Sequence, residues 1–134
     1  MFLLDTNIIS KFIRGDKNID LNLQRHSKES LSTCTIVKAE LFFGVEIHPS
    51  PRIGDILRNQ YFNLLAVMTV RDFDDASAEV FARIKAILKK AGTPIEDMDL
   101  LIASIAIANN LTLVTNNTKH FEKISGLNLA DWTK

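Results

Sequence analysis

The stretch MFLLDTNIIS, residues 1–10, decides the fold that we expect for the chain. Its apolar run at residues 2–4 is too short for a helix and is bounded by polar residues, which indicates a short buried strand. Apolar residues recur at helical spacing over 8–13, so a helix should follow. Asp5 lies at this junction, and its simplest role is to cap the helix, because aspartate often accepts the first free backbone N–H groups.

The rest of the chain alternates strand and helix patterns in the same way. Further strands are expected within 31–37, 66–70, 111–115 and 127–132, and further helices at 18–28, 36–47, 52–65, 74–91 and 96–109. Strands that alternate with helices predict an α/β fold with a central parallel β-sheet, covered by helices on both faces. Ligands bind such sheets beyond the carboxyl ends of the strands, which is where Asp5 falls.

Composition narrows the classes of function. The 134 residues favour one domain over 1–134, and a formal net charge of zero disfavours a nucleic-acid binder that is basic over its whole surface. The single cysteine, Cys34, excludes an internal disulfide and a cysteine-based zinc site, and a core position is its simplest role. No apolar run reaches the length of a membrane span, and Asp5 interrupts any signal-peptide pattern, so we expect a cytoplasmic protein.

Two more carboxylates are expected on apolar helix faces. Glu40 shares a face with Ile36, Phe43 and Ile47 at helical spacing, where an unpaired carboxylate would be costly to bury. An ion pair with Lys38 is the alternative.

Asp99 raises the same problem, because it should share the inward side of its helix with Ile102 and Ala106. Asp97 points away from that side and would complement the helix dipole. Residues 93–96, TPIE, are typical of a capping box with proline at the first helical position, which assigns Glu96 a structural role. Asp99 is therefore the acid without a local explanation.

Three acids that face inward near strand ends indicate a site for a hard divalent cation. Mg²⁺ and Mn²⁺ prefer oxygen ligands, and a bound ion can activate water for attack on a phosphate. No His/Cys zinc spacing, P-loop or GxGxxG motif competes with this reading.

At this point four segments taken in order are similar to a known family. LLDTN (3–7), TIVKAELFFG (35–44), GTPIEDMDLLIAS (92–104) and LTLVTNNTKHF (111–121) resemble the PIN domain, specifically the VapC-type ribonuclease toxins of bacterial toxin–antitoxin modules. DTN alone is weak evidence for the family. The four segments in order are strong evidence, and with the chain length they cover nearly the whole chain.

The resemblance implies a metal cluster of Asp5, Glu40 and Asp99, with Thr6 and Asn7 orienting Asp5 or the metal waters. The family often has a fourth acid after the last long strand. There this chain has Asn117, where many PIN domains have aspartate, and His120, where related toxins often have an acid. Asn117 could offer an oxygen or only form a turn in the left-handed region, and His120 could touch phosphate or lie at the surface.

The resemblance also implies a three-layer α/β/α fold and a Mg²⁺- or Mn²⁺-dependent endoribonuclease, with tRNA as a common target class. It implies a homodimer and a VapB-type antitoxin, through which alone the protein would meet DNA. The antitoxin should lie between the helices at 36–47 and 52–65, where apolar residues exceed what a small domain can bury. The residues expected to contact it are Phe42, Phe43, Leu57 and Tyr61.

Two rival functions remain at this stage. The missing fourth acid leaves a catalytically weak PIN module that mainly binds RNA or a partner. A flavodoxin-like regulatory domain is disfavoured, because the N-terminal acidic pair of that class is missing. Basic residues must help to hold RNA beside an acidic site, and the candidates are Lys11, Arg14, Lys38 and Lys119.

Overall fold

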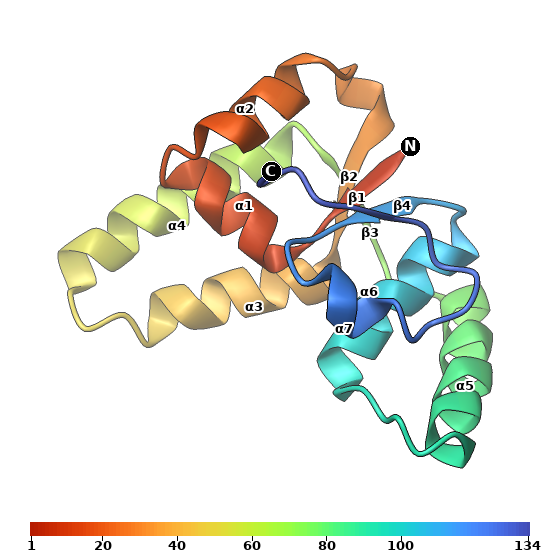
Figure 1. Ribbon diagram of the computed structural model, residues 1–134. Helices are drawn as coiled ribbons and strands as arrows, with labels where there is room; N and C mark the ends of the chain where they lie inside the picture. The colour runs from red at the N-terminus through yellow and green to blue at the C-terminus, as the bar shows by residue number, and fades with distance from the viewer.

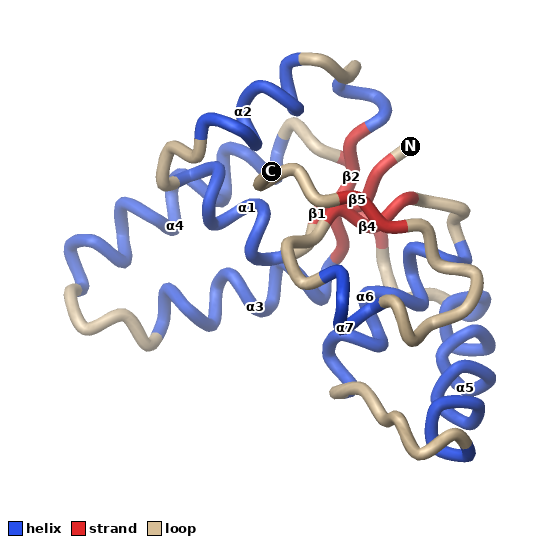
Figure 2. Tube along the Cα trace, in the orientation of Figure 1, coloured by secondary structure: helices blue, strands red, loops and turns tan.

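The computed structural model describes residues 1–134 as a five-stranded sheet with seven α-helices around it (Figures 1 and 2). The strands are β1 (Phe2–Leu4), β2 (Leu31–Cys34), β3 (Thr69–Arg71), β4 (Thr112–Val114) and β5 (Leu129–Ala130). The helices are α1 (Thr6–Ile13), α2 (Lys17–Gln24), α3 (Thr35–Glu46), α4 (Pro51–Ala66), α5 (Asp75–Lys90), α6 (Asp97–Ala108) and α7 (Thr118–Phe121). A short 3₁₀ helix, Lys28–Ser30, precedes β2.

The strands are all parallel and lie in the order β3-β2-β1-β4-β5. β1 is central, with Phe2 opposite both Leu31 of β2 and Thr112 of β4. The chain builds the sheet outward from β1 through β2 to β3, then returns to add β4 on the other side of β1. The strand order therefore reverses between β1 and β4, and such a switch point is where open parallel sheets form ligand sites.

Helices cover both faces of the sheet, so the predicted α/β/α architecture is confirmed. In Figures 1 and 2, α1, α2 and α4 lie on one side of the sheet, and α5 and α6 lie on the other. The core between these layers is aliphatic, and Leu3, Ile8, Ile102, Ile105 and Leu113 are fully buried. None of the helices has the length and hydrophobicity needed to span a membrane.

Two strand boundaries differ from the prediction. The strand expected within 31–37 ends at Cys34, and Thr35 already begins α3. The β-branched residues Thr35, Ile36 and Val37 are therefore helical, and Val37 is fully buried. The strand expected at 66–70 is shorter, because β3 is an edge strand that pairs only with β2 and begins at Thr69.

The expected capping box is wrong as well. α6 begins at Asp97, and its N-cap, Glu96, makes no side-chain capping bond, so residues 93–96 lie before the helix. The four residues of α7 were not expected, since so short a helix leaves no periodic pattern in the sequence.

Candidate active site

Asp5 lies at the switch point, directly after β1, where its backbone N–H and its carboxylate together make three hydrogen bonds. Its backbone N–H donates to the Val114 carbonyl (3.0 Å), which continues the pairing of β1 with β4. Its carboxylate accepts from the Thr6 backbone N–H at Oδ1 (2.8 Å) and from the Thr115 hydroxyl at Oδ2 (2.8 Å). Asp5 therefore caps α1, as the simplest reading held, and is also fixed in orientation by the neighbouring strand.

The environment of Asp5 favours a neutral side chain or a nearby cation. The residue is only 5% exposed. Burial is the main cause that raises the pKa of Asp5 from 3.8 to about 6, and the bonds from Thr115 and Thr6 oppose the rise. The carboxylates of Asp99 and Glu40 add to it by charge repulsion. The three predicted acids are thus close enough to act on one another through their charges.

Glu40 reaches the site from α3, the helix that follows β2. Its Oε1 accepts a hydrogen bond from the Thr6 hydroxyl (2.6 Å), and no ion pair with Lys38 forms. The helix face predicted for Glu40 is wrong, however, because Phe43 and Ile47 are each 63% exposed. Glu40 lies at the side of α3, near α1, and does not interrupt a buried stripe.

Asp99 enters the site from the first turn of α6. Its Oδ2 lies 3.0 Å from His120 Nε2, in an arrangement whose angles do not make a regular hydrogen bond. Asp97, two residues earlier, forms an exposed ion pair with Lys85 (2.9 Å). The prediction that these two acids face different ways is therefore confirmed, and Asp97 pairs with α5 besides lying near the helix dipole.

The remaining predicted residues have smaller roles in this geometry. Thr6 bonds both Asp5 and Glu40, whereas Asn7 is exposed and its amide lies at the limit of contact with Asn116 (3.5 Å). Asn117 is exposed at the N-terminus of α7 with a φ of −107°, so it does not adopt the left-handed turn that was considered. Its backbone N–H donates to the Thr115 hydroxyl (3.1 Å).

Thr115 also contacts the candidate site, although no sequence pattern singles it out. It is fully buried, and its hydroxyl joins the Asn117 backbone to the Asp5 carboxylate. The available signal was a hydroxyl one residue past β4, but only the pairing of β4 with β1 brings it to Asp5.

The carboxylates of Asp5, Glu40 and Asp99 are the type of ligand that a hard cation prefers, but they lie too far apart to bind one ion together. No three Asp, Glu, His or Cys side chains stand close enough together to hold a metal ion. Glu40 Oε2 and Asp99 Oδ1 accept no bond from the protein and are available as oxygen ligands. Oxygen-only ligands of this kind suit Mg²⁺ and Mn²⁺, and shared binding would need the Glu40 and Asp99 side chains to move toward Asp5.

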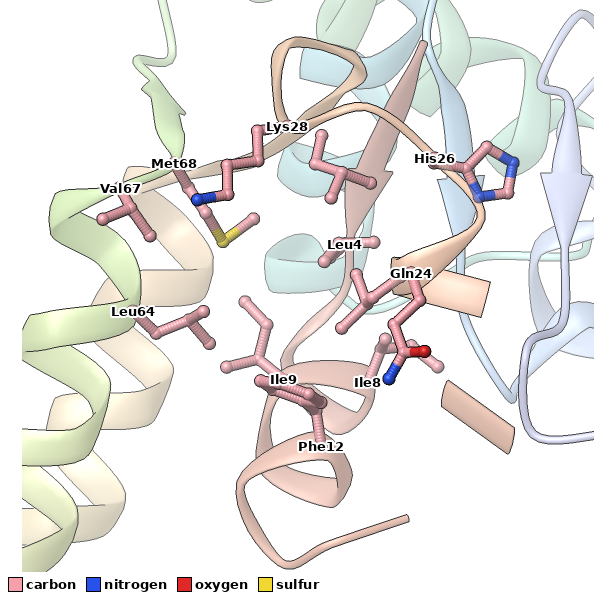
Figure 3. Close-up of a pocket in the computed structure, with 12 residues that line it drawn as sticks. Leu4, Ile8, Ile9, Phe12, Gln24, His26, Lys28, Leu64, Val67 and Met68 are labelled. Carbon is pink, nitrogen blue, oxygen red and sulfur yellow. The ribbon is translucent and has the colours of Figure 1, made fainter. Parts of the chain in front are cut away.

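A separate apolar cavity of about 360 Å³ lies on the other side of α1 (Figure 3). Ile9 and Phe12 of α1 line it on one side, and Leu64, Val67 and Met68 of α4 and its end line it on the other. Figure 3 also shows Lys28 and Gln24 at this cavity. Because nine of its twelve lining residues are hydrophobic, the cavity suits an apolar group and not a phosphate.

The four residues expected to contact a partner differ in exposure. Phe43 is 63% exposed, and Phe42 and Leu57 are partly buried. Tyr61 is only 7% exposed, so it lies beneath the surface that was predicted for it. Two cations lie near the Phe42 ring: Lys38 Nζ is 5.9 Å and Arg58 Cζ is 5.3 Å from the ring centroid.

Comparison with known proteins places this geometry in a family. The PIN domain model matches residues 2–127. The chain is 34% identical to the ribonuclease VapC2 of Rickettsia felis, over 100% of this chain and 99% of that protein. It is 31% identical to the tRNA(fMet)-specific endonuclease VapC of Shigella flexneri, over 98% of each.

A solved structure agrees with the sequence comparisons. The crystal structure of VapBC2 from Rickettsia felis bound to a DNA fragment from its promoter matches with a TM-score of 0.87 and 32% identity, over 98% of each chain. Fold, site and sequence therefore lead to one conclusion: the chain belongs to the PIN-domain family and is a homologue of the VapC ribonucleases.

Proposed function

We propose that this protein is a metal-dependent endoribonuclease that acts as the toxin of a type II toxin–antitoxin module in the cytoplasm. The observation that carries the proposal is the placing of Asp5, Glu40 and Asp99 around the switch point, where repulsion from two carboxylates contributes to raising the pKa of the third. Clustered carboxylates of this kind are stabilised by a divalent cation. Named relatives that are ribonucleases support the reaction class.

The three acids differ in how many hydrogen bonds hold them in place. Asp5 is fixed by Thr115 and by the Thr6 N–H, so it provides a rigid oxygen at the carboxyl end of β1. Glu40 is oriented by the Thr6 hydroxyl, and Asp99 approaches from α6. When bound there, Mg²⁺ or Mn²⁺ supplies an acidified water and neutralises charge on the phosphate. The three carboxylates would hold it and orient that water.

The test is cleavage of RNA by the purified protein. Single-stranded RNA and total tRNA should be cut in Mg²⁺ or Mn²⁺, and EDTA should abolish the cut. Because one relative is specific for tRNA(fMet), initiator tRNA is the first tRNA to try. Full cleavage in EDTA would refute the metal requirement, and no cleavage of any RNA with either metal would refute the nuclease.

A VapB-type antitoxin is the proposed partner, and contact with DNA would come through that partner alone. The VapBC2 structure of Rickettsia felis, a complex bound to a promoter fragment, supports an antitoxin partner and a complex that binds DNA. A homodimer of the chain belongs to the same proposal. Sedimentation of the chain alone and with its antitoxin would measure both associations.

We further propose that the antitoxin covers the exposed apolar surface of α3 and α4, which carries Phe43 and is continued inward by Phe42 and Leu57. Exposed apolar residues of this size usually mark an interaction site. Val67, 63% exposed, lies instead at the apolar cavity next to α1.

Phe43→Ser and Val67→Asp separate the two surfaces, because both positions are exposed and neither change should unfold the protein. Loss of antitoxin affinity in Phe43→Ser alone supports the proposed surface. Loss of antitoxin affinity in Val67→Asp alone would show that the antitoxin binds at the apolar cavity instead.

One observation favours a second candidate, a catalytically weak PIN module. His120 occupies the place where related toxins often have an acid, and its Nε2 lies 3.0 Å from Asp99 Oδ2. A histidine there cannot add the negative charge of a fourth acid. His120→Asp should raise metal-dependent cleavage if the module is weak for this reason, whereas unchanged cleavage would reject that explanation.

A further inference from the structure

A small cleft opens from the acidic site and runs between α1, α3 and α4, which lie close together in Figure 1. Its volume is about 220 Å³. Thr6 and Glu40 form the end next to the acids, and Ser10, Gly44, Leu57 and Tyr61 lie farther along it. The cleft is thus continuous with the catalytic centre, and a substrate bound at Asp5 would place its neighbouring group there.

The lining of the cleft selects against phosphate. Its lining contains the Glu40 carboxylate and no lysine or arginine, and the Arg14 charge acts only on Tyr61, so a second phosphate would be repelled at the Glu40 end. Half of its eight residues are hydrophobic, Leu57 among them, and these suit an apolar face. The volume is also below the ~300 Å³ at which pockets begin to take drug-sized ligands, so the occupant is a fragment and not a whole nucleotide.

Polar groups in the cleft are available for hydrogen bonds. Tyr61 is only 7% exposed, and its hydroxyl is not among the buried polar groups that lack a partner, so it reaches solvent and can bond a ligand in the cleft. The pKa of a tyrosine lies well above neutral, and burial raises that of Tyr61 further against the opposing Arg14 charge, so this hydroxyl is a donor at neutral pH. The Ser10 hydroxyl donates to the Asn7 carbonyl (3.2 Å) and keeps its lone pairs free to accept.

We propose that this cleft holds one unpaired base of the RNA, next to the phosphate that is cut. A base combines apolar faces with polar edges, and single-stranded RNA is recognised through bases splayed out of the stack. The inference rests on the proposed ribonuclease activity and adds a base-binding subsite to it.

Gly44 offers a direct way to fill the cleft. A Cβ built at Gly44 would meet no atom within 4 Å, and Gly44 lies within α3, where an ordinary side chain is tolerated. Gly44→Val therefore places its Cβ in open space and adds two methyl groups to the lining of the cleft. Ala39→Val is the matched control, because Ala39 is exposed on the same helix and does not line the cleft.

The experiment uses an RNA oligonucleotide of mapped cleavage position, with or without an abasic residue on each side of that position. Removing the base that enters the cleft should lower kcat/KM of the wild type about tenfold, the range of one stacked base. Gly44→Val should lose a similar factor on intact RNA and become insensitive to the abasic change. Ala39→Val should behave like the wild type.

Tyr61→Phe is a second variant that removes only the hydroxyl, and it should weaken discrimination between bases at the same position. Equal wild-type rates on intact and abasic RNA would overturn the proposal. So would a Gly44→Val variant that changes only inhibition by an antitoxin segment, because the cleft would then belong to the antitoxin. If no RNA is cut, the proposed ribonuclease function fails, and the subsite is then tested by binding alone. Equal affinity for the intact and abasic oligonucleotides in Ca²⁺ would overturn the base-binding subsite.

Discussion

Helices α3 and α6 look alike in sequence and behave differently in the structure. Both are twelve residues long and apolar around most of their circumference, and each contributes one acid to the site, Glu40 or Asp99. Yet six residues of α6 are buried and only two of α3, namely Val37 and Leu41.

The difference follows from position in the layers. α6 packs between the sheet and α5, so neighbours cover it on two sides, whereas α3 runs beside α4 away from the sheet (Figure 1). An all-round apolar helix is expected to be buried or to bind a partner. This pair of helices shows that the apolar pattern alone does not distinguish a buried helix from one that binds a partner.

The largest expected effect is on stability, from truncation of the two helices. Ile105→Ala on α6 should lower the free energy of unfolding by about 3–5 kcal/mol, because Ile105 is fully buried and the change leaves a cavity. Phe43→Ala on α3, at 63% exposure, should change it by about 0.5 kcal/mol or less. Urea denaturation measures both. Similar losses in the two variants would show that α3 is part of the core.

The next effect is catalytic and compares two acids on α6. Asp99→Asn should reduce metal-dependent RNA cleavage about 100-fold or more, because it removes one of the anionic oxygens proposed to hold the divalent cation. Asp97→Asn should leave the rate nearly unchanged, since Asp97 pairs with Lys85 at the surface. Single-turnover rates with thermal melting as a folding check make the comparison. Glu40→Gln on α3 should fall between the two variants, and equal rates for Asp97→Asn and Asp99→Asn would contradict the site.

The third effect is electrostatic and is read at Asp5, whose pKa of about 6 exceeds its ordinary 3.8. The folded protein therefore binds this proton more tightly than the unfolded chain. The free energy of unfolding should rise as the pH falls from about 6 toward 4, and the destabilisation is complete above pH 6. Asp5→Asn should remove this dependence and add up to about 3 kcal/mol at pH 7.

The same carboxyl distinguishes α6 from α3. Asp99 raises the pKa of Asp5 more than Glu40 does, so Asp99→Asn should lower that pKa further than Glu40→Gln. NMR titration of the Asp5 carboxyl carbon gives both values. A larger decrease in Glu40→Gln would mean that the Glu40 charge on α3 acts on Asp5 more strongly than the Asp99 charge on α6 does.

The smallest effect concerns one surface ion pair beside each helix. Lys85–Asp97 joins α5 to α6 at 2.9 Å, and Arg58–Glu46 joins α4 to α3 at 3.3 Å. All four side chains are at least half exposed, so each coupling should be about 0.5 kcal/mol or less. Double-mutant cycles at low and high salt measure them. A coupling above about 1 kcal/mol would show an ion pair shielded from solvent.

The sequence by itself determined the fold class and the sites of most helices, and it indicated Asp5, Glu40 and Asp99 as candidate acids while assigning Glu40 to the wrong helix face. These follow from hydrophobic periodicity, which is local, and from motifs in a family order. Periodicity was less informative at segment ends, where it misplaced the ends of two strands and the start of α6.

Only the tertiary structure decided what lies next to each acid. Thr115 reaches Asp5 across 110 residues, and Thr6 reaches Glu40 across 34, because parallel pairing of β1 with β4 and packing of α1 on α3 bring distant segments together. No local pattern encodes such contacts. The exposure of Phe43 is likewise a property of the layer that α3 joins, since the comparably apolar α6 is buried between the sheet and α5.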